Sequence, residues 1–188
     1  MYFRILLIFM FVTSLAAEPV ININYKYYSL NTKSVNNLLS DINRSTPIKE
    51  NNQIFHGHTD SYINWKFRWK ITNGKCLIED VSTNVDITYI LPKLTNREKS
   101  HELLKLWENW YPALVKHENI HAAHAVTIAN KIEYEIINLP FRYNCKELEN
   151  DANKTGNKLI KKLNELDLIY DNKTQHGKSE GANLSTHL

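Results

Sequence analysis

The sequence predicts an α+β fold, in which a small antiparallel sheet with one early helix packs on a helical half. Two observations predict it. Residues 20–30 and 53–91 have the alternating texture of strands, whereas apolar residues from about 95 onward recur at helical spacing. The length suits one domain, which we place at residues 17–177. A polar stretch at 178–188 is expected to be a flexible tail.

The first 16 residues have the features of a secretory signal peptide. One basic residue, Arg4, precedes a short apolar run, and small residues at Ser14 and Ala16 follow it. The run is short for a transmembrane helix. We therefore expect cleavage after Ala16 or one residue later, no stable membrane anchor, and a protein exported to the periplasm or secreted.

The β half begins with a strand at 20–30 and a short helix at 35–42 that Ser34 caps. Further strands are predicted at 54–59, 62–72, 76–81 and 85–91. Asn73-Gly74 is a strong hairpin turn, and Pro92 is expected to end the sheet.

The helical half contains three predicted helices. The first begins after Thr95, and Pro112 interrupts it, so we expect a second helix from Pro112 to Asn138. A third is predicted at 145–166.

The second of these helices contains the pattern H-E-x-x-H. His117 and His121 lie four residues apart, hence on one helical face, and can bind one divalent metal, usually zinc. Glu118 is placed to deprotonate a metal-bound water. The same stripe continues through apolar residues, where unpaired imidazoles are costly. The pattern therefore indicates one Zn²⁺ per chain, with Glu118 as catalytic base.

Catalytic zinc usually takes three protein ligands, and the residues alone leave the third one open. His124 lies about 10 Å along the helix from His117, which disfavours convergence on one ion. The other candidates are Glu147, Glu149, Asp171 and His176. His56 and His58, on one face of a strand, are outside candidates that we interpret as surface or packing residues.

The cysteine content and the net charge indicate whether the chain has a disulfide bond and a nucleic-acid partner. Cys76 and Cys145 form an even pair, which in an exported chain predicts a disulfide bond. Without Arg4, 22 basic residues face 20 acidic ones, a net charge of about +2. This mild and evenly spread charge does not indicate a nucleic-acid partner.

Several motifs resemble the DUF922 family, a group of exported bacterial proteins described as predicted secreted zinc-dependent proteases. The resemblance rests on H-E-x-x-H and on Y-D-x-x-T-x-H-G at residues 170–177, and also on the following residues: Thr59, Trp65, Cys76, Pro92, Trp107, Leu114 and Cys145. It covers nearly the whole mature chain. It implies a zincin-like domain with His176 as third zinc ligand, and Asp171 as the alternative or as a residue that orients a ligand.

The expected function is therefore that of a secreted zinc metalloprotease that acts on a protein or peptide substrate. Two alternatives remain: a non-catalytic zinc-binding envelope or interaction protein, and a zinc amidase that acts on cell-wall material. The sequence indicates neither the substrate nor the oligomeric state.

Overall fold

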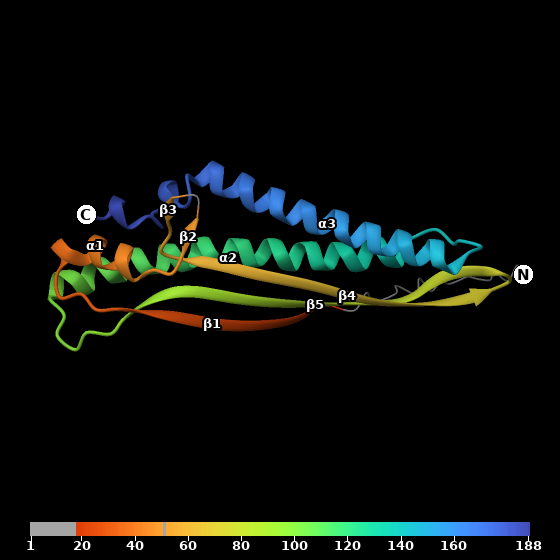
Figure 1. Cartoon of the computed structure of the whole chain (residues 1–188), viewed down its shortest axis with the longest axis horizontal. Helices are drawn as coiled ribbons and strands as arrows, with labels where there is room; N and C mark the ends of the chain where they lie inside the picture. Colours follow the sequence, from red (N-terminus) through yellow and green to blue (C-terminus); the bar gives the residue numbers. More distant parts are fainter. Residues whose placement is uncertain (1–17, 51) are drawn as a thin grey trace, which may run out of the picture.

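The protein has an α+β fold in which a three-stranded mixed sheet lies along two long antiparallel helices (Figure 1). The structure, a computed structural model, describes residues 18–50 and 52–188. The predicted signal peptide lies outside these residues. No helix in the described part of the chain has the length and apolar character needed to cross a bilayer.

The sheet consists of β1 (Val20–Leu30), β4 (His58–Thr72) and β5 (Lys75–Leu94) in the order β1-β5-β4. As predicted, Asn73-Gly74 joins β4 and β5 in an antiparallel hairpin, and both turn residues have positive φ. The prediction of a purely antiparallel sheet is wrong, because β1 pairs with β5 in parallel. Since β5 returns along the middle of the sheet, β1 lies beside a strand of its own direction.

β5 is one continuous strand, where two strands ending before Pro92 were expected. Pro92 lies inside it and pairs with Tyr28 of β1. On the other side, β4 stops pairing at Ile90, so β5 has no partner there at Pro92. An unpaired strand side tolerates a residue that lacks an N–H group.

The helix α2 (His101–Ile137) is also continuous, and the prediction of a new helix at Pro112 is wrong. Proline removes the hydrogen bond to the carbonyl four residues earlier, here Glu108. Both Pro112 and Glu108 are exposed, so water can bond the freed carbonyl. The helix therefore passes through the proline on its solvent side.

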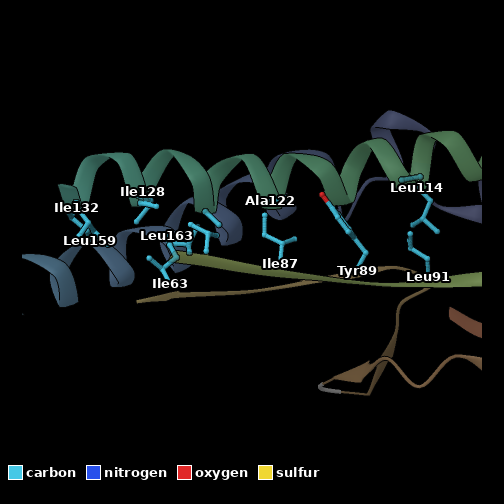
Figure 2. Close-up of a cluster of buried hydrophobic side chains, with 14 of the residues drawn as sticks. Ile63, Ile87, Tyr89, Leu91, Leu114, Ala122, Ile128, Ile132, Leu159 and Leu163 are labelled. Atoms are coloured by element: carbon cyan, nitrogen blue, oxygen red, sulfur yellow. The ribbon is translucent and has the colours of Figure 1, made fainter. Parts of the chain in front are cut away.

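The core lies between one face of the sheet and the two long helices (Figure 2). Alternate residues of β5 point toward α2, among them Ile87, Tyr89 and Leu91, and α2 contributes its apolar stripe, including Ala122 and Ile128. Leu163 of α3 (Cys145–Thr174) packs beside Ile63 of β4, and Leu159 lies beside Ile132 of α2. This packing fixes α2 and α3 relative to each other, and so fixes residues that lie far apart in the sequence.

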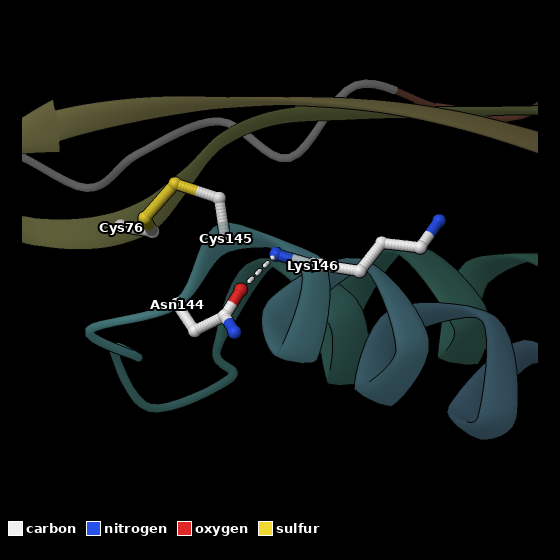
Figure 3. Close-up of a disulfide and its surroundings, with 4 residues drawn as sticks. All are labelled: Cys76, Asn144, Cys145 and Lys146. Atoms are coloured by element: carbon white, nitrogen blue, oxygen red, sulfur yellow. Dashed lines mark hydrogen bonds between the residues drawn. A yellow bond between two sulfur atoms is a disulfide. The ribbon is translucent and has the colours of Figure 1, made fainter.

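A disulfide bond joins Cys76, near the β-hairpin turn, to Cys145 at the start of α3, which confirms the predicted pairing (Figure 3). Asn144 caps α3, because its side chain accepts a hydrogen bond from the Lys146 amide at 2.9 Å. The opposite end of the molecule contains α1 (Val35–Ser45), the small β2–β3 hairpin (Lys49–Glu50 and Gln53–Ile54) and the end of α3 (Figure 1).

The expectation of a flexible C-terminal tail is also corrected. Residues 178–188 form two short 3-10 helices, η1 (Lys178–Glu180) and η2 (Leu184–Thr186). Ala182 and Leu184 are buried, and the indole nitrogen of Trp110 donates to the Ala182 carbonyl at 2.8 Å. Although the segment is mostly polar, its two buried apolar residues and this hydrogen bond pack it against α2.

Candidate metal centre

Three side chains converge at one point between α2 and α3. The Nε2 atoms of His117 and His121 each lie 3.2 Å from Oδ1 of Asp171. The two histidines come from successive turns of α2, and Asp171 comes from the last turns of α3. One ligand atom from each of the three lies within 4.8 Å of the other two. Two imidazole nitrogens and one carboxylate oxygen are a donor set that suits zinc.

The opposite nitrogen of each ring also contacts a carboxylate. Nδ1 of His117 lies 3.3 Å from Oε2 of Glu180, and Nδ1 of His121 lies 2.9 Å from Oδ1 of Asp167. Such contacts fix the proton on Nδ1 and leave Nε2 free to bind a metal, as is usual for histidine ligands. Both rings are therefore held in the orientation that a metal site requires.

Glu118 lies beside these ligands and is held by β4. It is 4% exposed, and Thr59 of β4 donates to its Oε2 at 2.8 Å. A Cβ atom at Gly57 would lie 2.7 Å from Oε1 of Glu118, so only glycine leaves room for the carboxylate there. Burial raises the pKa of Glu118, although the hydrogen bond from Thr59 and the nearby histidines oppose this shift. A carboxylate with a raised pKa is better suited to accept a proton near neutral pH.

The C-terminal motif forms the end of α3 and the turn that follows it. The Thr174 hydroxyl accepts from the Gly177 amide at 3.1 Å, and Gln175, His176 and Gly177 have positive φ. A Cβ atom at Gly177 would lie 2.6 Å from Ala182 Cβ and 3.2 Å from the His117 ring. The motif therefore ends the helix and turns the chain back, which places Glu180 against His117.

Tyr170 packs on the same centre. Its ring stacks on that of His117 with centroids 4.9 Å apart, and its hydroxyl donates to Glu180 Oε2 at 2.6 Å. Burial and the contact with Glu180 raise its pKa. The hydroxyl is thus engaged in holding Glu180, and Glu180 in turn holds His117.

The charges of the cluster favour a cation between the two rings. Burial lowers the pKa of His121, but hydrogen bonds to Asp167 and Asp171 outweigh it and raise that pKa to about 10. The pKa of His117 rises for a similar reason, through Asp171 and Glu180. For Asp171, burial is outweighed by the two histidines, and its pKa falls well below the usual range. A divalent cation would compete with protons for this position.

His176 lies near the centre but outside the converging group. Its side chain is 42% exposed, and its Nδ1 is 3.9 Å from the other oxygen of Asp171, Oδ2. The geometry favours Asp171, the alternative in the sequence analysis, over His176 as third ligand.

The remaining candidates lie outside the converging group of His117, His121 and Asp171, although His124 joins His121 and Asp167 in a second cluster of possible ligands. Glu147 and Glu149 occupy the opposite end of α3, about 35 Å from Asp171 along the helix. His124 shares Asp167 with His121, with its Nδ1 2.8 Å from Oδ1. His56 contacts Asn43 at 2.7 Å, and its ring lies against Trp110.

The centre opens on a hollow of about 510 Å³. Glu118, His121 and Asp171 form one wall, and β2 together with the start of β4 forms the other. His58 and His176 also line it. A molecule that enters this hollow therefore meets both the converging donors and the buried carboxylate of Glu118.

Two residues of the centre, Asp167 and Glu180, were not predicted from the sequence. Asp167 precedes Asp171 by four residues and so lies on the same helical face, but the predicted third helix ended one residue before it, at 166. Glu180 lies in the segment that was expected to be a flexible tail, and no signal in the sequence distinguished it from other surface acids.

The chain was compared with models of known protein families. The model of a family described as "Bacterial protein of unknown function (DUF922)" matches residues 25–177. The chain belongs to this family. The match extends from β1 to the glycine that turns the chain back, so all three converging residues lie within it. No curated protein and no solved structure matches the chain.

Proposed function

We propose that this DUF922 protein is an exported zinc-dependent hydrolase that cleaves peptide bonds, with a zincin-like active site. One observation supports this most directly. The Nε2 atoms of His117 and His121 converge with Asp171, while both Nδ1 atoms contact other carboxylates. Two exposed histidines that share a helix face by chance have no reason to be oriented at both ring nitrogens.

Each residue of the site would have a defined role in metal binding or proton transfer. His117, His121 and Asp171 would hold the zinc, with Glu180 and Asp167 orienting the two rings. Bound zinc lowers the pKa of a water ligand toward about 7 and polarises a carbonyl group. Glu118, kept in place by Thr59, would accept the proton of the attacking water and deliver it to the leaving amine.

The second candidate is a non-catalytic, structural zinc site. His176 favours it, because its Nδ1 lies only 3.9 Å from Asp171 and a small movement would make it a fourth ligand. A closed site with four protein ligands leaves no position for water. The buried carboxylate of Glu118 and the open hollow beside it support the hydrolase instead, since a structural site uses neither.

The test combines metal content with hydrolysis. The purified mature protein should contain about one zinc per chain, and Glu118→Gln should retain this zinc but lose at least about 100-fold in hydrolysis of unfolded protein substrates. Glu108→Gln, an exposed position on the same helix, is the matched control and should behave as wild type. Full hydrolytic activity in Glu118→Gln would refute the hydrolase proposal. Including peptidoglycan fragments among the substrates separates a peptidase from a cell-wall amidase.

A further inference from the structure

We propose that a groove along the free edge of β4 binds an extended polypeptide by strand addition and leads it to the metal centre. The cleavage of that polypeptide rests on the proposed hydrolase function, but its binding does not. The groove is defined by residues 58–65 of β4 and by residues 153–171 on the facing side of α3.

The sheet leaves β4 with an unpaired side. In the order β1-β5-β4, β4 pairs only with β5 along its whole length. The backbone N–H and C=O groups on its outer side have no sheet partner among the described residues. Such an edge offers hydrogen-bonding groups at the repeat of an extended chain and is a common mode of peptide recognition.

Two hollows follow one another along this edge. The first, at the metal centre, is lined by His58 and Thr59 of β4 and by Asp167 and Asp171 of α3. The second, of about 450 Å³, lies between residues 61–65 of β4 and the preceding turns of α3. Because the linings are consecutive on both elements, the two hollows trace one path that ends at the metal centre.

The second hollow contains an unused polar group and a polar wall. Ser61, which lines this hollow, has a buried Oγ with no hydrogen-bond partner in the described part of the chain, although such groups are normally satisfied. The α3 side presents the amides of Asn157 and Asn164, together with the apolar Ile160, while Asn153 accepts a hydrogen bond from the Trp65 indole nitrogen at 3.3 Å where the groove ends. Amide side chains both donate and accept, so they suit a peptide backbone of any sequence.

The length of the groove sets the size of the bound segment. From Thr59 to Trp65 the strand advances six residues, about 20 Å at 3.3 Å per residue. A polypeptide paired with this stretch would have about six residues on one side of the bond to be cleaved. The site should therefore prefer unfolded or extended segments to dipeptides.

The test measures the binding of an extended polypeptide to a variant that is expected not to hydrolyse it. Fluorescein-labelled, reduced and carboxymethylated α-lactalbumin serves as an extended polypeptide, titrated by anisotropy into Glu118→Gln. Adding Asn157→Trp, an exposed position that lines the groove, should weaken binding at least about tenfold. Lys158→Trp, the next and equally exposed residue, lies outside the groove lining and should change binding less than about twofold. Hydrogen exchange should show protection of amides at 61–65 in the complex.

Each other result overturns one of the proposals. No binding, equal effects of the two tryptophans, or protection elsewhere would refute the groove. Competition by a peptidoglycan tetrasaccharide but not by peptide would replace the polypeptide with a glycan. If the protein hydrolyses long peptides and Asn157→Trp leaves the KM unchanged, the hydrolase proposal is supported and the groove proposal is refuted. If binding depends on the groove but the parent protein shows no hydrolysis, the groove proposal is supported and the hydrolase proposal is refuted.

Discussion

Replacing each of the two candidates for the third metal ligand in turn tests the candidate metal centre most directly, because the two residues lie close together. Asp171→Asn keeps the size of the side chain but removes the charge that meets both histidines at 3.2 Å. His176→Ala removes a half-exposed ring whose Nδ1 is 3.9 Å from Asp171. We expect the first change to impair zinc binding strongly and the second to alter it little.

The magnitudes follow from the contacts. Loss of a residue that only orients a ligand costs about 10–100-fold in metal affinity, so loss of a direct ligand should cost at least about 100-fold, or about 2.8 kcal/mol. His176 makes no contact short enough to be a hydrogen bond with Asp171. Its removal should change affinity less than about threefold.

The assay is competition for zinc against a chromophoric chelator of known affinity. Near-UV circular dichroism in excess EDTA checks that both variants remain folded without metal, so that a loss of affinity is not a loss of structure. A tenfold or larger loss in His176→Ala with normal affinity in Asp171→Asn would refute the geometric argument and restore His176 as the ligand.

Three further predictions concern the surroundings of the centre and the stability of the fold. Asp167→Asn should weaken zinc binding about 10–100-fold, measured by the same competition, since it frees the Nδ1 of one ligand ring; unchanged affinity would show that this contact does not orient the ring. Burial lowers the pKa of His56 to about 4 from 6.5. The unfolded chain therefore binds more protons below pH 6.5, and stability should decrease as the pH falls from about 6.5 to 4, by at most about 3 kcal/mol; urea unfolding in EDTA should show less of this decrease in His56→Gln, and an identical pH profile would contradict the shift. Replacing both Cys76 and Cys145 by alanine opens a loop with a sequence separation of 69 and should cost about 4 kcal/mol in urea unfolding; an unchanged midpoint would mean that the crosslink does not constrain the unfolded chain.

The part of the centre on α2 could be predicted from the sequence because it is local. Residues four apart on a helix share a face whatever the tertiary structure, so His117 and His121 follow from spacing alone. The apolar stripe beyond them identified the buried side of the helix, and the structure buries Ala125, Ile128 and Ile132 as expected. The two cysteines were paired by elimination, since the chain has no others.

The parts that failed depend on tertiary packing. Whether Pro112 breaks a helix depends on whether its lost hydrogen bond faces water, and local sequence does not give that direction. The partner of β1 depends on where β5 returns in the sheet, which is a long-range choice. Both features depend on which surfaces become buried when the elements pack together. The periodicity of apolar residues shows the buried side of one element, but not which other element covers it.

The third ligand shows how one boundary error propagates into a site. Ending α3 at 166 placed the terminal motif in a separate segment, and the resemblance to DUF922 then favoured His176 as third ligand over Asp171. In the structure the helix continues to Thr174, so Asp167 and Asp171 share a face, and the antiparallel packing of α3 on α2 directs both toward the histidines. Thr174 and Gly177 then end the helix and turn the chain so that Glu180 reaches the other ring. The motif therefore shapes the candidate metal centre chiefly through helix geometry, and an insertion of one residue between 167 and 171 would rotate Asp171 by about 100° and separate it from both rings.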